Sequence, residues 1–182
     1  NTADTPHVRC LWTMSKEKRV LLWEKLQSQL QLRDLGLGGE IDGKRCVVDD
    51  EELAILCPHG SLHELQQLLL HTAIRLKDSG LRALALAGCG PQLTSLTLSC
   101  LWLVTDSGLK ALASMGCGPQ LTSLTLTDLM NGVTDSGLSA FASAGCGAQL
   151  TSLTLKWLKK GVTDVGLCTL ASARCGAQLT SL

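Results

Sequence analysis

Leucines recur along this chain at a fixed spacing, within the hexapeptide Leu-Thr-Ser-Leu-Thr-Leu. The hexapeptide occupies residues 93–98, 121–126 and 150–155, and a fourth copy begins at Leu179. Successive copies start 28, 29 and 29 residues apart. A fixed period in the twenties is typical of a stacked repeat array, in which each unit buries its apolar face against the next one.

The first part of each unit predicts a short strand. In the unit that begins at Leu93, Leu96 and Leu98 alternate with the polar residues Ser95 and Thr97. Successive side chains of a strand point to opposite faces, so the two leucines share one face and the polar residues share the other. We expect Leu96, Leu124 and Leu153 to stack on one another in a continuous core.

The second part of the unit predicts a helix. Thr105 and Asp106 are residues that cap helix starts, because their side-chain oxygens accept from free N–H groups of the first turn. Leu109 and Leu112 follow at helical spacing. Gly116 is suited to end the helix in a left-handed conformation. Each unit therefore reads as a strand, an ascending loop, a helix and a descending loop.

The repeated motifs resemble those of leucine-rich repeat proteins. The Val-Thr-Asp-x-Gly-Leu segment, with a cysteine before the next strand, resembles the cysteine-containing subclass found in F-box-type adaptors, and the period resembles the ribonuclease-inhibitor subclass. The resemblance implies an α/β right-handed solenoid with a curved parallel sheet inside and helices outside. The family's usual Asn or Cys at the ninth repeat position is replaced here by Ala73, Leu101, Leu129 and Leu158. The loops must therefore satisfy their backbone groups in another way.

The pattern divides the chain into an N-terminal segment and a repeat region. Residues 1–31 are predicted to form a lead-in and a capping helix, with an apolar stripe at Val20, Trp23, Leu26 and Leu30. A docking helix, such as a degenerate F-box-like segment, is the alternative. Residues 32–182 are predicted to form leucine-rich repeats, with units at 32–64, 65–92, 93–120, 121–149, 150–178 and a truncated 179–182. Because the last unit stops within a strand pattern, we expect a capping repeat to follow.

The first unit is longer than the others, and its extra length falls in residues 38–45. We expect a surface turn there. This stretch also spells Gly-x-x-x-x-Gly-Lys, the start of a phosphate-binding loop, but Arg45 follows where that loop needs Ser or Thr for magnesium. We therefore predict no bound cofactor.

The amino-acid composition limits the kinds of partner that we expect and indicates a cellular compartment. The chain has 16 basic and 16 acidic residues, which argues against nucleic acid as the general partner. No apolar run approaches the ~20 residues of a membrane helix, so we predict no membrane insertion. Of nine cysteines, four recur at one repeat position: Cys89, Cys117, Cys146 and Cys175. This spacing favours reduced thiols in an intracellular compartment, most simply the cytoplasm, with organellar import as an alternative.

Catalytic and metal chemistry find little support in the sequence. Cys57, His59 and His63 are close together but lack a second matching pair of ligands, so no metal site is predicted. The recurring Asp106, Asp135 and Asp164 are expected to cap helix starts and to complement the helix dipole. With no nucleophile and base in a defensible constellation, we predict that the protein is not an enzyme.

The predicted function is a non-enzymatic scaffold that binds a protein partner. The partner would lie on the concave face or on the ascending-loop edge, and possible forms are the substrate-recognition subunit of a ubiquitin ligase or an architectural subunit of a large ciliary, ribosomal or organellar assembly. Solenoids bind along their curved sheet, and binding hot spots favour Trp. The candidate contact residues are Ser95, Thr97, Trp102, Thr125, Thr127, Asp128, Thr154, Lys156 and Trp157. The alternative for the two tryptophans is that they fold back over the loops.

Overall fold

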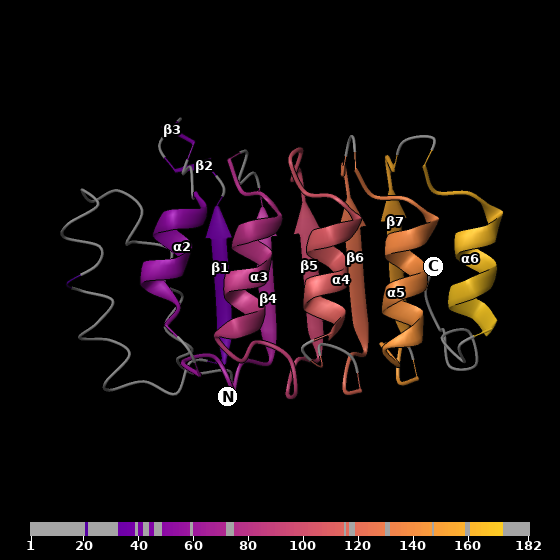
Figure 1. Cartoon of the computed structure of the whole chain (residues 1–182), viewed down its shortest axis with the longest axis horizontal. Coiled ribbons are helices and arrows are strands. Elements are labelled where there is room, and N and C mark those ends of the chain that lie inside the picture. The colour runs from indigo at the N-terminus through magenta and orange to yellow at the C-terminus, as the bar shows by residue number, and fades with distance from the viewer. Residues whose placement is uncertain are drawn as a thin grey trace.

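The computed structural model describes most of the repeat region. Its described residues are Leu21 and residues 33–38, 40–41, 44–45, 49–58, 60–71, 75–114, 116, 119–129, 132–146, 148–158 and 161–172. The capping helix predicted within residues 1–31, apart from Leu21, and the stub at 179–182 lie outside these residues. In the described part, helices stand side by side in a row that covers one face of a parallel sheet (Figure 1).

Strands and helices alternate along the chain, as the repeat pattern predicts. The sheet has the order β1-β4-β5-β6-β7, so each strand pairs with the strand of the next unit. Its strands are β1 (Asp34–Gly38), β4 (Gln67–His71), β5 (Ser95–Ser99), β6 (Ser123–Thr127) and β7 (Ser152–Lys156). The helices are α2 (Asp50–Leu56), α3 (Asp78–Leu86), α4 (Asp106–Ser114), α5 (Asp135–Ser143) and α6 (Asp164–Leu170). This arrangement is an α/β repeat solenoid.

The leucine core is continuous across the units. Leu96 pairs in register with Leu124, and Leu124 pairs with Leu153, which confirms the predicted stacking. These three side chains are at most 5% exposed, and Leu93, just before β5, is fully buried. Because a parallel strand covered by helices buries its core side chains completely, the leucines bind neighbouring units together through apolar burial.

The helix starts differ from the prediction in the role of the aspartates. Thr134 is the N-cap of α5, and its hydroxyl oxygen accepts from the backbone N–H of Ser136. Asp135 is the first residue of the helix, and its carboxylate binds the next unit: it accepts from the backbone N–H of Thr163 at 2.8 Å and from the Thr163 hydroxyl at 2.6 Å. The prediction that these aspartates cap their own helices was therefore wrong, because the adjacent threonine holds that position.

The same contact recurs between successive units, and we name it the Asp–Thr ladder. Asp78 accepts from Thr105, and Asp106 accepts from Thr134, each through one backbone N–H and one hydroxyl. Asp50 accepts in the same way from the backbone N–H of Lys77 and the hydroxyl of Ser79. The ladder supplies partners to backbone donors of the loops, which is the role that the missing Asn or Cys leaves open.

The glycine of the repeated Thr-Asp-x-Gly-Leu motif is required by this ladder. A Cβ atom at Gly108 would lie 2.6 Å from Asp78 Oδ1 and 2.8 Å from Leu81 Cδ1 of the preceding unit. Both distances are shorter than van der Waals contact allows, so any side chain here would displace the ladder carboxylate. The motif is thus explained by packing between units.

A second ladder runs along the starts of the strands. The hydroxyl of Thr122 donates to the backbone carbonyl of Thr94 at 3.0 Å, and the hydroxyl of Thr151 donates to the carbonyl of Thr122 at 3.1 Å. The backbone N–H of each threonine donates to the same carbonyl. The Leu-Thr-Ser-Leu-Thr-Leu hexapeptide therefore carries a hydrogen-bonding threonine as well as core leucines.

The insertion in the first unit is more regular than the predicted surface turn. Two short strands, β2 (Glu40–Ile41) and β3 (Lys44–Arg45), pair antiparallel within it. They are separated in the sequence by Asp42-Gly43, a dipeptide that favours tight hairpins. The prediction of a surface turn did not include these strands, which are only two residues long.

Candidate protein-interaction surface

The sheet face opposite the helices is mainly small and hydroxylated. In β5 and β6, Ser95, Thr97, Thr125 and Thr127 alternate with the buried leucines and are half-buried. Thr154 of β7 is also half-buried, and Lys156 is exposed. Parallel pairing aligns Thr97, Thr125 and Thr154 in one row across three strands. The row offers hydroxyl groups to a partner, and it continues on β4 to Leu69, which pairs with Thr97 and is 39% exposed.

The residue that directly follows a strand has an unusual backbone in three successive units. Cys100, Asp128 and Trp157 have φ values of 56°, 55° and 52°. Left-handed backbone costs most residues roughly 1–2 kcal/mol, and Asp tolerates it better than a bulky aromatic residue. The conformation turns the chain from the sheet toward the helix layer, and it is held by the bonds from Cys100 N to Thr127 O and from Asp128 N to Lys156 O, both 3.0 Å.

Large apolar side chains are exposed just after the strands. Trp157 is 76% exposed, Leu103 is 47% exposed and Trp102 is 40% exposed, whereas the neighbouring leucines Leu101 and Leu129 are buried. The tryptophans therefore do not fold into the core of the ascending loops. We name Trp102, Leu103, Asp128, Lys156 and Trp157 the post-strand edge.

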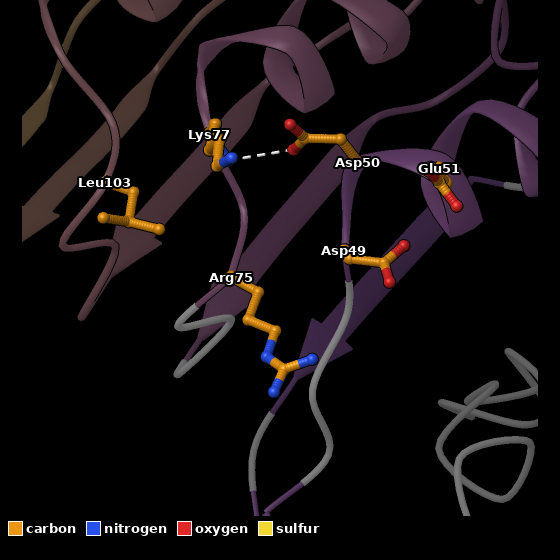
Figure 2. Close-up of a pocket in the computed structure, with 6 residues that line it drawn as sticks. All are labelled: Asp49, Asp50, Glu51, Arg75, Lys77 and Leu103. Carbon is orange, nitrogen blue, oxygen red and sulfur yellow. Dashed lines mark hydrogen bonds between the residues drawn. The ribbon is translucent and has the colours of Figure 1, made fainter.

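A groove of about 410 Å³ opens on the same side of the repeat array, between the loops and the helix starts (Figure 2). Its lining residues are Asp49, Asp50, Glu51, Arg75, Lys77 and Leu103. Two of its carboxylates are used in the fold: Asp49 caps α2 by accepting from Glu52 N, and Asp50 belongs to the Asp–Thr ladder. The exposed residues of the groove are Glu51, Arg75, Lys77 and Leu103.

The structure brings some of the predicted contact residues together and separates others. Asp128 and Trp157 occupy the same position of successive units, and Lys156 precedes Trp157. Trp102 lies two residues later in its own unit. The prediction did not include Leu103, which forms an isolated parallel bridge with Lys77 and is 47% exposed. No pattern in the sequence predicts that the Leu103 side chain is exposed.

Two titratable groups of the described residues have pKa values shifted by their surroundings. Burial raises the pKa of the Cys57 thiol to about 12, so it stays protonated. The hydroxyl and backbone N–H of Thr163 lower the pKa of Asp135. Cys89 and Cys146, two of the four recurring cysteines, are buried in the core. Cys117 and Cys175 lie outside the described residues.

Two of the three residues that lie close together in the sequence, Cys57 and His63, are among the described residues. His63 bonds through Nδ1 to the Gly60 carbonyl and lies 3.8 Å from Glu64, while Cys57 is buried at the end of α2. His59 lies outside the described residues. Across the described part of the chain, no three His, Cys, Asp or Glu side chains are placed to hold a metal ion. None of the described helices is long and apolar enough to span a membrane.

Comparison with known proteins places the chain by fold. No protein-family model matches the sequence, and neither does any curated protein. A chain in the crystal structure of the Rad7 and Elc1 complex in yeast is similar in structure, with a TM-score of 0.58 and 23% sequence identity. The similarity covers 74% of this chain and 32% of that chain, so this protein spans about a third of its neighbour's length. At this identity the similarity shows the fold alone.

Proposed function

We propose that the protein is a non-enzymatic interaction scaffold that holds a protein partner at its post-strand edge. The observation that carries the proposal is the exposure of Trp157, Trp102 and Leu103 on one edge of an otherwise regular array. Tryptophan is enriched at binding hot spots because it buries a large apolar area on association. Lys156 and Asp128 flank the aromatic residues and supply charges that can orient a partner.

The backbone at Trp157 supports the same proposal. A bulky residue in the left-handed region costs stability, and its exposed side chain returns little through packing in the free protein. Asp128 occupies the equivalent position at lower strain. A tryptophan held there is better accounted for by a contact made outside the chain than by the stability of the fold.

The fold neighbour provides further support, since that chain was crystallised in a complex of Rad7 with Elc1. We retain two narrower forms of the scaffold proposal. A ubiquitin-ligase subunit would recruit an adaptor through residues 1–31, whereas an architectural subunit would co-sediment with a large particle. Purification of the chain with and without residues 1–31 separates the two, because only the first loses its adaptor on truncation.

The test of the proposed edge is affinity purification from the native source with the wild-type chain and with Trp102→Ala/Trp157→Ala. We expect the variant to lose the partner while it remains folded, because Trp157 is 76% exposed and Trp102 is 40% exposed. Thr97→Ala/Thr154→Ala, on the sheet face, is the matched control. Retention of the partner by the tryptophan variant would rule out the post-strand edge as the contact.

A further inference from the structure

A second groove lies on the helical side of the molecule, between α3 and α4. It has a volume of about 470 Å³ and is lined by Arg82, Leu86, Ser107, Lys110, Ala111 and Ser114. All six residues come from the two helices, which are packed side by side (Figure 1). This groove is separate from the post-strand edge and shares no residue with it.

Comparison of the units shows which groove residues the fold does not require. Arg82 and Lys110 occupy the same helical position, where α5 has Ser139 and α6 has Cys168. Leu86 is 40% exposed, and the equivalent residue is Ser114 in the next unit. Since the other units stack without these side chains, packing between units does not explain them.

The groove carries two exposed cations, Arg82 and Lys110, and each has an aspartate four residues earlier on its own helix, Asp78 and Asp106. Arg82 and Lys110 are exposed, and no carboxylate among the described residues forms an ion pair with either. The carboxylates nearest along the helices, Asp78 and Asp106, bind Thr105 and Thr134 through the Asp–Thr ladder. The whole chain has a formal net charge of zero, so the positive charge belongs to this site and not to a generally basic surface.

We propose that this groove binds an acidic segment of a partner protein that carries one aliphatic side chain. The aliphatic side chain would lie against Leu86 and Ala111, and carboxylates on either side would meet Arg82 and Lys110. Ser107 and Ser114 also line the groove, and the Ser114 hydroxyl donates to the backbone carbonyl of Ala111 at 2.9 Å. An apolar floor between two cations fits such a segment better than a phosphate backbone, which needs no apolar contact.

The probe is a labelled helical peptide in which a leucine is flanked by glutamates, and the reference peptide has glutamine at the same positions. Fluorescence anisotropy gives the two dissociation constants, and amide chemical shifts locate the contact. We expect the acidic peptide to bind more tightly and to shift amides of α3 and α4. Equal affinity for the two peptides would overturn the proposal, as would shifts confined to the post-strand edge.

Variants separate the groove from general charge effects. Arg82→Gln/Lys110→Gln should weaken binding of the acidic peptide roughly threefold to tenfold, the range for two exposed ion pairs. Leu86→Ser, which introduces the serine found at this position in the next unit, should weaken the binding of both peptides. Arg33→Gln removes an exposed cation outside both grooves and outside the post-strand edge and should leave the affinity unchanged; a loss equal to that of the Arg82→Gln/Lys110→Gln variant would contradict the proposal.

A membrane is the competing source of negative charge. Vesicles that contain phosphatidylserine are added to the protein in place of the peptide, and the chemical shifts of the α3 and α4 amides are measured again. We expect the acidic peptide and not the vesicles to shift them. If vesicles shift these amides and the peptide does not, the groove serves a lipid surface and the proposal is wrong.

Discussion

The two halves of each ascending loop behave differently. The first half reads Cys-Leu-Trp-Leu, Asp-Leu-Met-Asn and Trp-Leu-Lys-Lys at residues 100–103, 128–131 and 157–160. The second half reads Val-Thr-Asp-Ser-Gly-Leu twice and Val-Thr-Asp-Val-Gly-Leu once. The repeated half carries the Asp–Thr ladder, whereas the variable half carries Trp102 and Trp157 on the surface. Positions that repeat bind the units together, and positions that vary are available to a partner.

We expect the largest change in stability from a substitution in the leucine core. Leu124→Ala removes a side chain that is 1% exposed and stacked between two strands, so we expect a loss of about 2–5 kcal/mol in the free energy of unfolding. Thr125→Ala, on the other sheet face, should cost less than about 0.5 kcal/mol. Denaturant titration measures both, and equal losses would contradict the assignment of the two faces.

The Asp–Thr ladder should give the next largest effect. Asp106→Ala leaves the backbone N–H and the hydroxyl of Thr134 without their acceptor, so we expect a loss of about 1–3 kcal/mol. Asp164 has the same position in its unit but accepts no hydrogen bond from another described residue. Its change to alanine should stay within about 0.5 kcal/mol. Similar losses for the two would show that the aspartates act within their own helices.

A substitution in the variable half should act in the opposite direction. Trp157→Asn relieves a left-handed bulky residue that is largely exposed, so the free energy of unfolding should rise by about 0.5–1 kcal/mol. The reverse change at the equivalent position, Asp128→Trp, should lower it by a similar amount. Thermal melts of the two variants measure these changes. A Trp157→Asn variant that melts well below wild type would mean that the tryptophan stabilises the fold.

The smallest expected effect is a dependence on pH. The pKa of Asp135 is lowered in the folded state by the Thr163 hydroxyl and backbone N–H. A depressed folded pKa contributes stability above the ordinary value of 3.8, and this contribution is lost as the pH falls further through the folded value. Melting temperatures measured down to acidic pH should therefore fall less steeply for Thr163→Val than for wild type. Parallel curves would show that this bond does not set the pKa.

Much of the fold could be predicted because it depends on periodic positions. The repeated pattern predicts that Leu96 lies in register with Leu124. It also predicts the short strand of each unit and the left-handed Gly116 at the end of α4. The site could be predicted less well. Whether Trp157 is buried depends on a backbone turn shared with Asp128, and no residue type common to the two positions signals that turn.

The role of the aspartates illustrates a second limit. Thr134 and Asp135 are adjacent, and both are favoured at helix starts, so sequence alone could not separate the cap from the inter-unit acceptor. The partner of Asp135 lies 28 residues farther along the chain, at Thr163. Because three successive units carry the same Thr-Asp pair, the sequence does not show whether an aspartate acts within its own unit or accepts from the threonine of the next one, and only the coordinates distinguish the two.

The Asp–Thr ladder also gives the array a polarity. Each interior unit accepts with its aspartate toward one neighbour and donates with its threonine toward the other. Such a joint is heterologous, so units can be added only head to tail, and a two-fold arrangement of ends would bring donor against donor or acceptor against acceptor. Units exchanged between arrays of this kind would need to carry both halves of the joint, whatever their surface residues are.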